Sequence, residues 1–146
     1  MYFDDFDVGF TVKTEPILIE RDKMMAFARE YDKIPLHTDD AYGKTTMFGE
    51  IIASGFYSAL VVYGAFTTDH VWQGGHIAGN RANFEFPKPV YAGDTLRGVV
   101  TVTNKKQLDS TKGVIEETLE IFNQSDVLVV RVTSSKFLKT RPQPEE

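Results

Sequence analysis

The chain has 146 residues, of which 42% are hydrophobic and 25% charged, a composition that indicates one globular domain and excludes wholesale disorder or a fibrous repeat. Sixteen Lys and Arg against 21 Asp and Glu leave a formal net charge of -5, which argues against nucleic acid as a partner. There is no cysteine, so a disulfide scaffold, a thiol nucleophile and thiolate-held metal sites are excluded.

The ends of the chain bear on location and domain boundaries. The first seven residues are acidic and aromatic, unlike a secretory signal, so we expect a cytoplasmic protein. The final stretch, residues 140–146, contains two prolines and terminal charges, and we expect a disordered C-terminal tail there. Residues 1–139 are then a single domain, since no internal repeat or linker divides them.

The first predicted element is a short amphipathic helix from Glu20 to Tyr31, where apolar residues recur at three- and four-residue intervals. Residues 32–37 follow. Pro35 lacks an amide donor and restricts the residue before it, so we predict a rigid loop. Thr38 is then expected to cap a short helical turn.

The next predicted helix, residues 54–69, carries apolar side chains around its whole circumference and must therefore be enclosed on all sides. It belongs to the longest stretch without a charge, residues 51–68, but the glycines and hydroxyl groups there favour a buried helix, and we expect no membrane span. Strand-like patterns follow at residues 81–86, 96–105, 113–123 and 127–138.

One enclosed helix followed by several long strands indicates the fold class. The pattern favours an α+β hotdog fold, in which a curved antiparallel β-sheet wraps a long central helix. Such a sheet leaves an edge strand open, and pairing with a second copy would cover that edge. We therefore expect a homodimer or a higher homo-oligomer.

The search for chemistry centres on His37. His70 is expected to cap the end of the buried helix, and His76 lies in a glycine-rich turn. His37 instead stands five residues beyond Asp32, across the stiff loop, so the two side chains can converge. A carboxylate and an imidazole can accept and donate a proton near neutrality, which is what adding or removing water requires. Structural roles, as a helix-terminal acid and a buried histidine, remain open for each residue.

A second candidate feature is the entrance of the buried helix at Ser54 and Gly55. The first amides of a helix lack intrahelical partners and can bind an oxyanion, and glycine lets a carbonyl approach the backbone. Alternatively, Ser54 is the N-cap and Gly55 relieves crowding, and both interpretations can hold together. The cluster of His37, Asp39 and Asp40 has only one histidine, so we expect no metal.

Three stretches stand in order along the chain: YDKIPLHTD at residues 31–39, FGEIIASG at 48–55 and FEFPKPVYAGD at 84–94. Together they resemble the motifs of the MaoC-like dehydratases, the hotdog family that includes (R)-specific enoyl-CoA hydratases. The resemblance extends over nearly the whole domain. It implies that Asp32 and His37 are catalytic and that the amide of Gly55 polarises a thioester carbonyl.

The resemblance also implies a reaction: hydration of a trans-2-enoyl thioester to an (R)-3-hydroxyacyl thioester, or the reverse dehydration, with no metal or redox cofactor. The substrate would be an acyl-CoA or an acyl-carrier-protein thioester. Ser54, Ile34 and Tyr63 are the candidates for substrate binding, Tyr63 because the acyl chain in related dimers enters along the central helix near the subunit boundary. The chain departs from the family motif at Tyr31 and Ile34, where glycine and asparagine are common.

Two other functions stay open on these residues. A hotdog acyl-CoA thioesterase would use water and a carboxylate to attack the acyl carbon. A non-catalytic acyl-thioester-binding subunit of a MaoC-like hetero-oligomer would bind without turnover, although such a subunit has no need for both Asp32 and His37. Chain length, carrier and the group that protonates carbon are left open.

Overall fold

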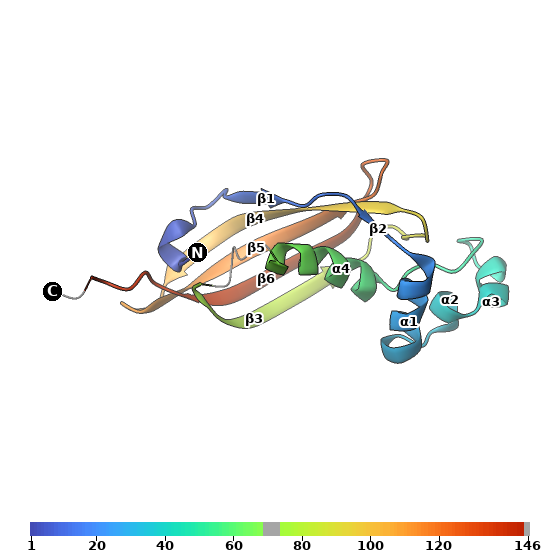
Figure 1. Cartoon of the computed structure of the whole chain (residues 1–146), viewed down its shortest axis with the longest axis horizontal. Coiled ribbons are helices and arrows are strands. Elements are labelled where there is room, and N and C mark those ends of the chain that lie inside the picture. Colours follow the sequence, from blue (N-terminus) through green and yellow to red (C-terminus); the bar gives the residue numbers. More distant parts are fainter. Residues whose placement is uncertain (69–73, 145–146) are drawn as a thin grey trace.

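The computed structural model describes residues 1–68 and 74–144, and over these residues it shows a six-stranded antiparallel sheet with one long helix lying across it (Figure 1). The strand order is β1-β4-β5-β6-β3, and β2 pairs with β4. The elements are η1 (Phe3–Asp5), β1 (Thr11–Lys13), β2 (Ile17–Leu18), α1 (Arg21–Tyr31), α2 (Pro35–Thr38), α3 (Asp40–Thr45), α4 (Gly55–Thr68), β3 (His76–Glu85), β4 (Thr95–Gln107), β5 (Lys112–Phe122) and β6 (Leu128–Lys139). The predicted fold class is therefore confirmed.

The core lies between α4 and one face of the sheet. Buried and partly buried residues alternate along β5, as expected for a strand with one covered face. Val62 and Phe66 of α4 are almost fully buried. At Gly98 of β4, an added Cβ would crowd Val62 and Phe66, so this glycine allows the helix to approach the sheet closely.

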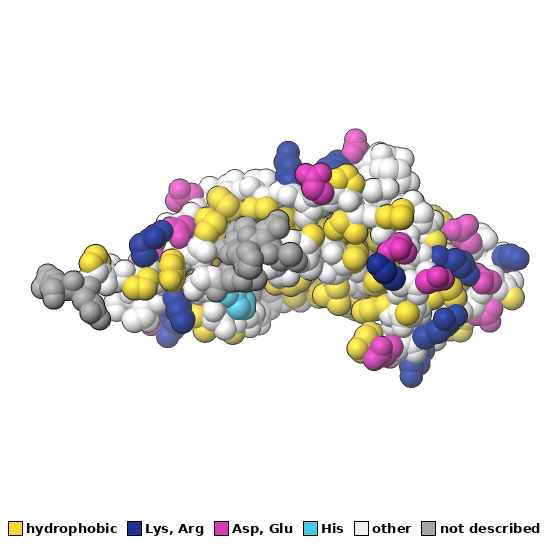
Figure 2. Space-filling view, viewed as in Figure 1, with side chains coloured by type: hydrophobic (Ala, Val, Ile, Leu, Met, Phe, Trp, Pro, Cys, Tyr) yellow, Lys and Arg dark blue, Asp and Glu magenta, His cyan; other side chains and the backbone are white. Residues whose placement is uncertain are grey.

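Within residues 1–68 and 74–144, nothing covers the opposite side of α4. Phe56, Leu60 and Tyr63, which follow one another at helical spacing, are 45%, 49% and 38% exposed. Figure 2 shows hydrophobic side chains over the middle of this face and charged side chains gathered at the end where α1, α2 and α3 lie. The prediction that the helix is enclosed on all sides is thus wrong for a single chain, because the sheet covers only one side.

The helices α1, α2 and α3 follow one another in the chain and lie together at one end of the sheet (Figure 1). The predicted amphipathic helix is confirmed as α1. The predicted rigid loop is partly wrong, because Pro35 begins the helical turn α2, a position where its missing amide costs nothing. The predicted cap is also corrected: Asp39, not Thr38, caps α3 and accepts bonds from the amides of Ala41 and Tyr42 at 3.0 and 3.2 Å.

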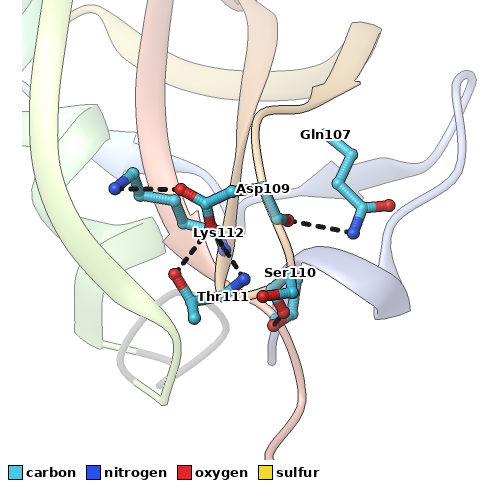
Figure 3. A network of polar contacts seen from close by, with 6 residues as sticks. Gln107, Asp109, Ser110, Thr111 and Lys112 are labelled. Atoms are coloured by element: carbon cyan, nitrogen blue, oxygen red, sulfur yellow. Dashed lines mark hydrogen bonds and ion pairs between the residues drawn. The ribbon is translucent and has the colours of Figure 1, made fainter.

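A polar turn joins β4 to β5 at the other end of the sheet (Figure 3). The Asp109 carboxylate accepts hydrogen bonds from the amide and hydroxyl of Thr111 at 2.8 and 2.7 Å and from the Lys112 amide at 3.1 Å. The Lys112 ammonium lies 3.2 Å from the same carboxylate. The hydrogen bonds from Thr111 hold the pKa of Asp109 well below its usual range.

Arg141 lies beside the first residues of the chain. The Arg141 amide donates to Asp4 at 2.6 Å, its guanidinium contacts the Asp5 carboxylate, and the Thr140 hydroxyl donates to the Ser110 carbonyl. The disordered tail and its boundary at residue 140 stay predictions. No helix in the described ranges is long and apolar enough to cross a lipid bilayer.

Candidate active site

Asp32 and His37 lie next to each other at the end of the sheet that carries α1, α2 and α3. Asp32 directly follows α1, and His37 lies in α2, so the turn between the two helices brings both side chains to one place. The Asp32 Oδ2 atom is 3.5 Å from the His37 Nε2 atom, and the side chains are 17% and 10% exposed. The two side chains thus converge as expected, while their catalytic role stays a prediction.

The His37 ring is held by the backbone of the second motif. Its Nδ1 atom lies 2.8 Å from the Ile52 carbonyl oxygen, and the Ile52 amide in turn donates to the Leu36 carbonyl at 3.2 Å. A carbonyl can only accept, so Nδ1 carries the hydrogen and donates it. Nε2 is then the ring atom that can take up or release a proton, and it is the one facing Asp32.

Ser54 fixes the carboxylate of the pair. Its hydroxyl donates to Asp32 Oδ2 at 2.7 Å, and the residue is fully buried. Its carbonyl accepts the first hydrogen bond of α4, from the Ser58 amide at 3.1 Å. The backbone of Ser54 therefore occupies the N-cap position at the start of α4, while its side chain donates a hydrogen bond to Asp32. Ser54 is absent from the lining of the pocket that Asp32 lines, and its predicted contact with substrate stays a prediction.

Gly55 lies at the start of α4, beside the pair. The amides of residues 55–57 precede the first intrahelical hydrogen bond, so they point toward the open end of the helix. A Cβ at Gly55 would overlap the ring of Phe86. Both interpretations of this glycine thus have a physical basis: it relieves crowding against Phe86, and it leaves the helix entrance accessible.

A pocket of about 570 Å³ opens in front of these groups. Asp32, His37 and Gly55 all line it, and so does the half-exposed Ile34. Lys88 also lines it. The rest of the lining is mainly apolar and includes Phe48, Phe56, Phe86, Pro89, Val129 and Val130. The site therefore combines one polar corner with a hydrocarbon wall.

The remaining sequence candidates lie elsewhere. Tyr63 lines a second pocket, of about 420 Å³, and is absent from the lining of the first. His76 is the first residue of β3 rather than part of a turn, and His70 lies outside the described residues. Across residues 1–68 and 74–144, no group of three or more His, Asp or Glu side chains is placed to hold a metal ion.

Sequence reasoning missed the partners that orient the pair. The Ile52 carbonyl and the Ser54 hydroxyl reach His37 and Asp32 only because residues 48–55 return beside residues 32–37. In the sequence, only the apolar residues of the second motif and the order of the two motifs indicate that residues 48–55 pack beside residues 32–37. Neither feature specifies which atoms form the hydrogen bonds.

The sheet and the helix across it define a protein of the hotdog class, and the carboxylate–imidazole pair at the amino end of that helix is its candidate active site. A family model described as "MaoC like domain" matches residues 5–123. The chain belongs to the MaoC-like dehydratase family.

The chain is also similar to two curated proteins and to a solved structure. The chain is 30% identical over 140 residues to the uncharacterized protein YdeM of Bacillus subtilis (strain 168), covering 95% of this chain and 99% of YdeM. It is 31% identical over 102 residues to an (R)-specific enoyl-CoA hydratase of Rhodospirillum rubrum, covering 70% of this chain and 69% of the relative. The crystal structure of a MaoC-like dehydratase from Rhodospirillum rubrum matches with a TM-score of 0.88 at 25% identity, covering 98% of this chain and 99% of the other.

Proposed function

We propose that this protein catalyses the (R)-specific hydration of a trans-2-enoyl thioester, or the reverse dehydration of a 3-hydroxyacyl thioester. The observation that carries the proposal is the Asp32 carboxylate 3.5 Å from His37 Nε2, at the polar corner of an otherwise apolar pocket. The relative from Rhodospirillum rubrum that is named an (R)-specific enoyl-CoA hydratase supports it.

In the proposed reaction, Asp32 and His37 bind a water molecule between them and remove one of its protons. The water oxygen forms a bond to C3 of the substrate, and the electron pair of the C2–C3 double bond moves toward the thioester oxygen. The protonated pair then delivers a proton to C2, which completes the addition of water. General acid–base groups placed in this way contribute about 10²- to 10⁴-fold to such rates.

The amino end of α4 would stabilise the charge that develops on the thioester oxygen. Gly55 lines the pocket, and its amide precedes the first intrahelical hydrogen bond, so this amide can donate to that oxygen. The helix dipole acts in the same direction. The chemistry needs no electron transfer, so it calls for no redox cofactor.

The pocket also supports the proposed substrate class. Its aromatic and aliphatic lining suits the hydrocarbon part of an acyl chain, which gains free energy on leaving water. Lys88 places a cation in the lining, where it can face the phosphate groups of CoA or of an acyl-carrier-protein pantetheine arm. Ile34, a hydrocarbon, occupies the rim at the position where family members commonly carry an amide.

We also propose that the protein acts as a homodimer formed through β3 and the exposed side of α4. β3 lies at one end of the strand order, and nearly all its residues are exposed in the single chain. Phe56, Leu60 and Tyr63 form an apolar strip beside it. An open strand edge next to an apolar strip favours pairing with a second copy through a two-fold axis.

The test is turnover of trans-2-enoyl-CoA, followed as loss of the absorbance of the conjugated thioester. We expect Asp32→Asn and His37→Gln each to reduce kcat/KM by about 10²- to 10⁴-fold while the fold is kept. The matched control is Asp22→Asn, which changes an exposed acid in the first turn of α1, the helix that Asp32 follows. This variant should retain activity. Rates like those of the unmodified protein in both site variants would contradict the proposal.

The same assay separates the two alternative functions. A thioesterase would release free CoA from a saturated acyl-CoA, which a hydratase leaves intact. A non-catalytic subunit would bind enoyl-CoA without any loss of absorbance. Either result would replace the proposed activity.

A further inference from the structure

The second pocket lies between α4 and the strands β3, β5 and β6. Leu60 and Tyr63 of α4 line one side, and Phe84 of β3, Glu117 of β5 and Lys136 of β6 line the other. Its volume is about 420 Å³. It takes no part in the reaction proposed above, and it contains a buried ion pair.

In that pair, the Lys136 ammonium lies 2.6 Å from Glu117 Oε1, and each side chain is only 4% exposed. The Ser134 hydroxyl donates to the same oxygen at 3.3 Å, and the Tyr63 ring centroid lies 5.7 Å from the ammonium. The other oxygen, Glu117 Oε2, is buried and has no hydrogen-bond partner within the part of the chain that the structure describes. A buried carboxylate oxygen without a donor is costly, and a ligand that supplies a donor removes that cost.

The two pockets are separated by a thin aromatic wall. The Phe56 ring packs edge-on against Phe84 and Phe86, with centroids 5.5 and 5.3 Å away. Phe84 lines the second pocket, whereas Phe56 and Phe86 line the pocket that holds Asp32. The two pockets therefore adjoin at the contact between Phe56 and Phe84, and an acyl chain that extends past Phe56 from the polar corner enters the lining that contains Glu117.

We infer that the second pocket receives the far end of the acyl chain and favours a chain that ends in a hydroxyl group. This inference rests on the proposed hydratase function. An added carboxylate would be repelled by the Glu117 carboxylate, and an added ammonium would lie beside the Lys136 ammonium. A hydroxyl can donate to Glu117 Oε2 without bringing a charge, whereas a methyl end leaves that oxygen without a donor.

The experiment compares trans-2-octenoyl-CoA with 8-hydroxy-trans-2-octenoyl-CoA on the unmodified protein, and includes the short substrate crotonyl-CoA. We expect kcat/KM for the hydroxylated chain to exceed that for the plain chain by about tenfold or more, as for a hydrogen bond to a charged group. Equal values, or a preference for the plain chain, would overturn the inference. Absence of turnover with all three substrates would overturn the proposed function itself.

A double variant tests the assigned residues. Glu117→Leu combined with Lys136→Met removes both charges at similar volume, a change that proteins often tolerate. We expect the preference for the hydroxylated chain to disappear, and its persistence would overturn the assignment. Arg97→Gln combined with Asp126→Asn, which removes an exposed ion pair of 2.6 Å outside both pockets, is the matched control and should keep the preference. If the double variant does not fold, the comparison on the unmodified protein still decides.

Discussion

The Asp32 carboxylate accepts a hydrogen bond from the buried residue Ser54. Ser54 donates to Asp32 Oδ2 at 2.7 Å, and Nε2 of His37 lies 3.5 Å from the same oxygen. One carboxylate oxygen thus has a fixed donor on one side and the imidazole on the other. This geometry makes Ser54 a positioning residue, whose contribution passes through Asp32.

Removing the Ser54 hydroxyl should therefore affect catalysis more than binding. For Ser54→Ala we expect kcat to fall by about tenfold with little change in KM, since a hydrogen bond to a charged group contributes about 1.5–3 kcal/mol. Steady-state kinetics with crotonyl-CoA would measure both values. Ser58→Ala is the control, because the Ser58 hydroxyl is equally buried on α4 but has no hydrogen-bond partner among the described residues. Equal kcat in the two variants would refute the role of Ser54.

A methyl group at the helix entrance gives a second test at the residue scale. In Gly55→Ala the new Cβ would overlap Phe86, so the ring or the helix start must move, at a cost of about 1–3 kcal/mol. We expect a lower melting temperature together with a lower kcat. In Gly64→Ala, on the same helix, the new Cβ has no neighbour within 4 Å among the described residues, and the substitution should raise stability by about 0.5–1 kcal/mol. Thermal unfolding of both variants measures the two opposite effects on stability. A melting temperature for Gly55→Ala equal to that of the unmodified protein would contradict the prediction.

The sequence predicted part of this site for a physical reason. His37 is the fifth residue after Asp32, and a stiff proline turn lies between them, so their proximity is a local property. The bonds from Ser54 to Asp32 and from His37 to Ile52 join segments 15 to 22 residues apart. Their geometry depends on how the folded chain returns on itself, and spacing in the sequence does not determine it.

At the scale of elements, α4 shows what composition leaves undecided. Apolar residues surround the helix, which predicts cover on every side, yet the sheet of this chain covers only one. A sequence pattern does not distinguish cover by the same chain from cover by a second copy. The strip of Phe56, Leu60 and Tyr63 is the part of α4 that stays exposed when only the described residues of one chain are present.

A charge in this strip should disrupt the proposed dimer. Leu60→Glu places a carboxylate at the centre of the apolar strip, where pairing would bury it without a partner. We expect the unmodified protein to sediment as a dimer and Leu60→Glu to shift toward the monomer in analytical ultracentrifugation. A monomeric unmodified protein, or a dimer unaffected by the charge, would contradict the proposed interface.

The turn between β4 and β5 should make stability depend on pH. Hydrogen bonds from Thr111 lower the pKa of Asp109 in the folded state, so the ionised form stabilises the fold. An acid whose pKa is lower in the folded state than in the unfolded state adds to the free energy of unfolding at any pH above its unfolded pKa. This stabilisation is lost progressively as the pH falls below about 4. We expect Asp109→Asn to lower the melting temperature at pH 7 and to lose less stability between pH 5 and pH 2.5. Parallel melting curves for the two proteins across this range would argue against the role of Asp109.

For the whole molecule, the hotdog architecture could be predicted because its elements carry strong periodic patterns. The alternation along β5 and the first part of β4 and the uncharged helix indicate the sheet and its central element. Other features arise only when strands and helix pack together. Glu117 and Lys136 lie 19 residues apart on neighbouring strands, and nothing in the local sequence distinguishes this buried pair from solvated charges.

The proposed site adds water to C3 of an enoyl thioester. The most direct measurement is the reaction of trans-2-enoyl-CoA in water enriched in oxygen-18, with the products analysed by mass spectrometry and chiral chromatography. We expect (R)-3-hydroxyacyl-CoA with the label in its C3 hydroxyl group and the thioester intact. Label in the carboxyl group of a released free acid, or no labelled product at all, would contradict it.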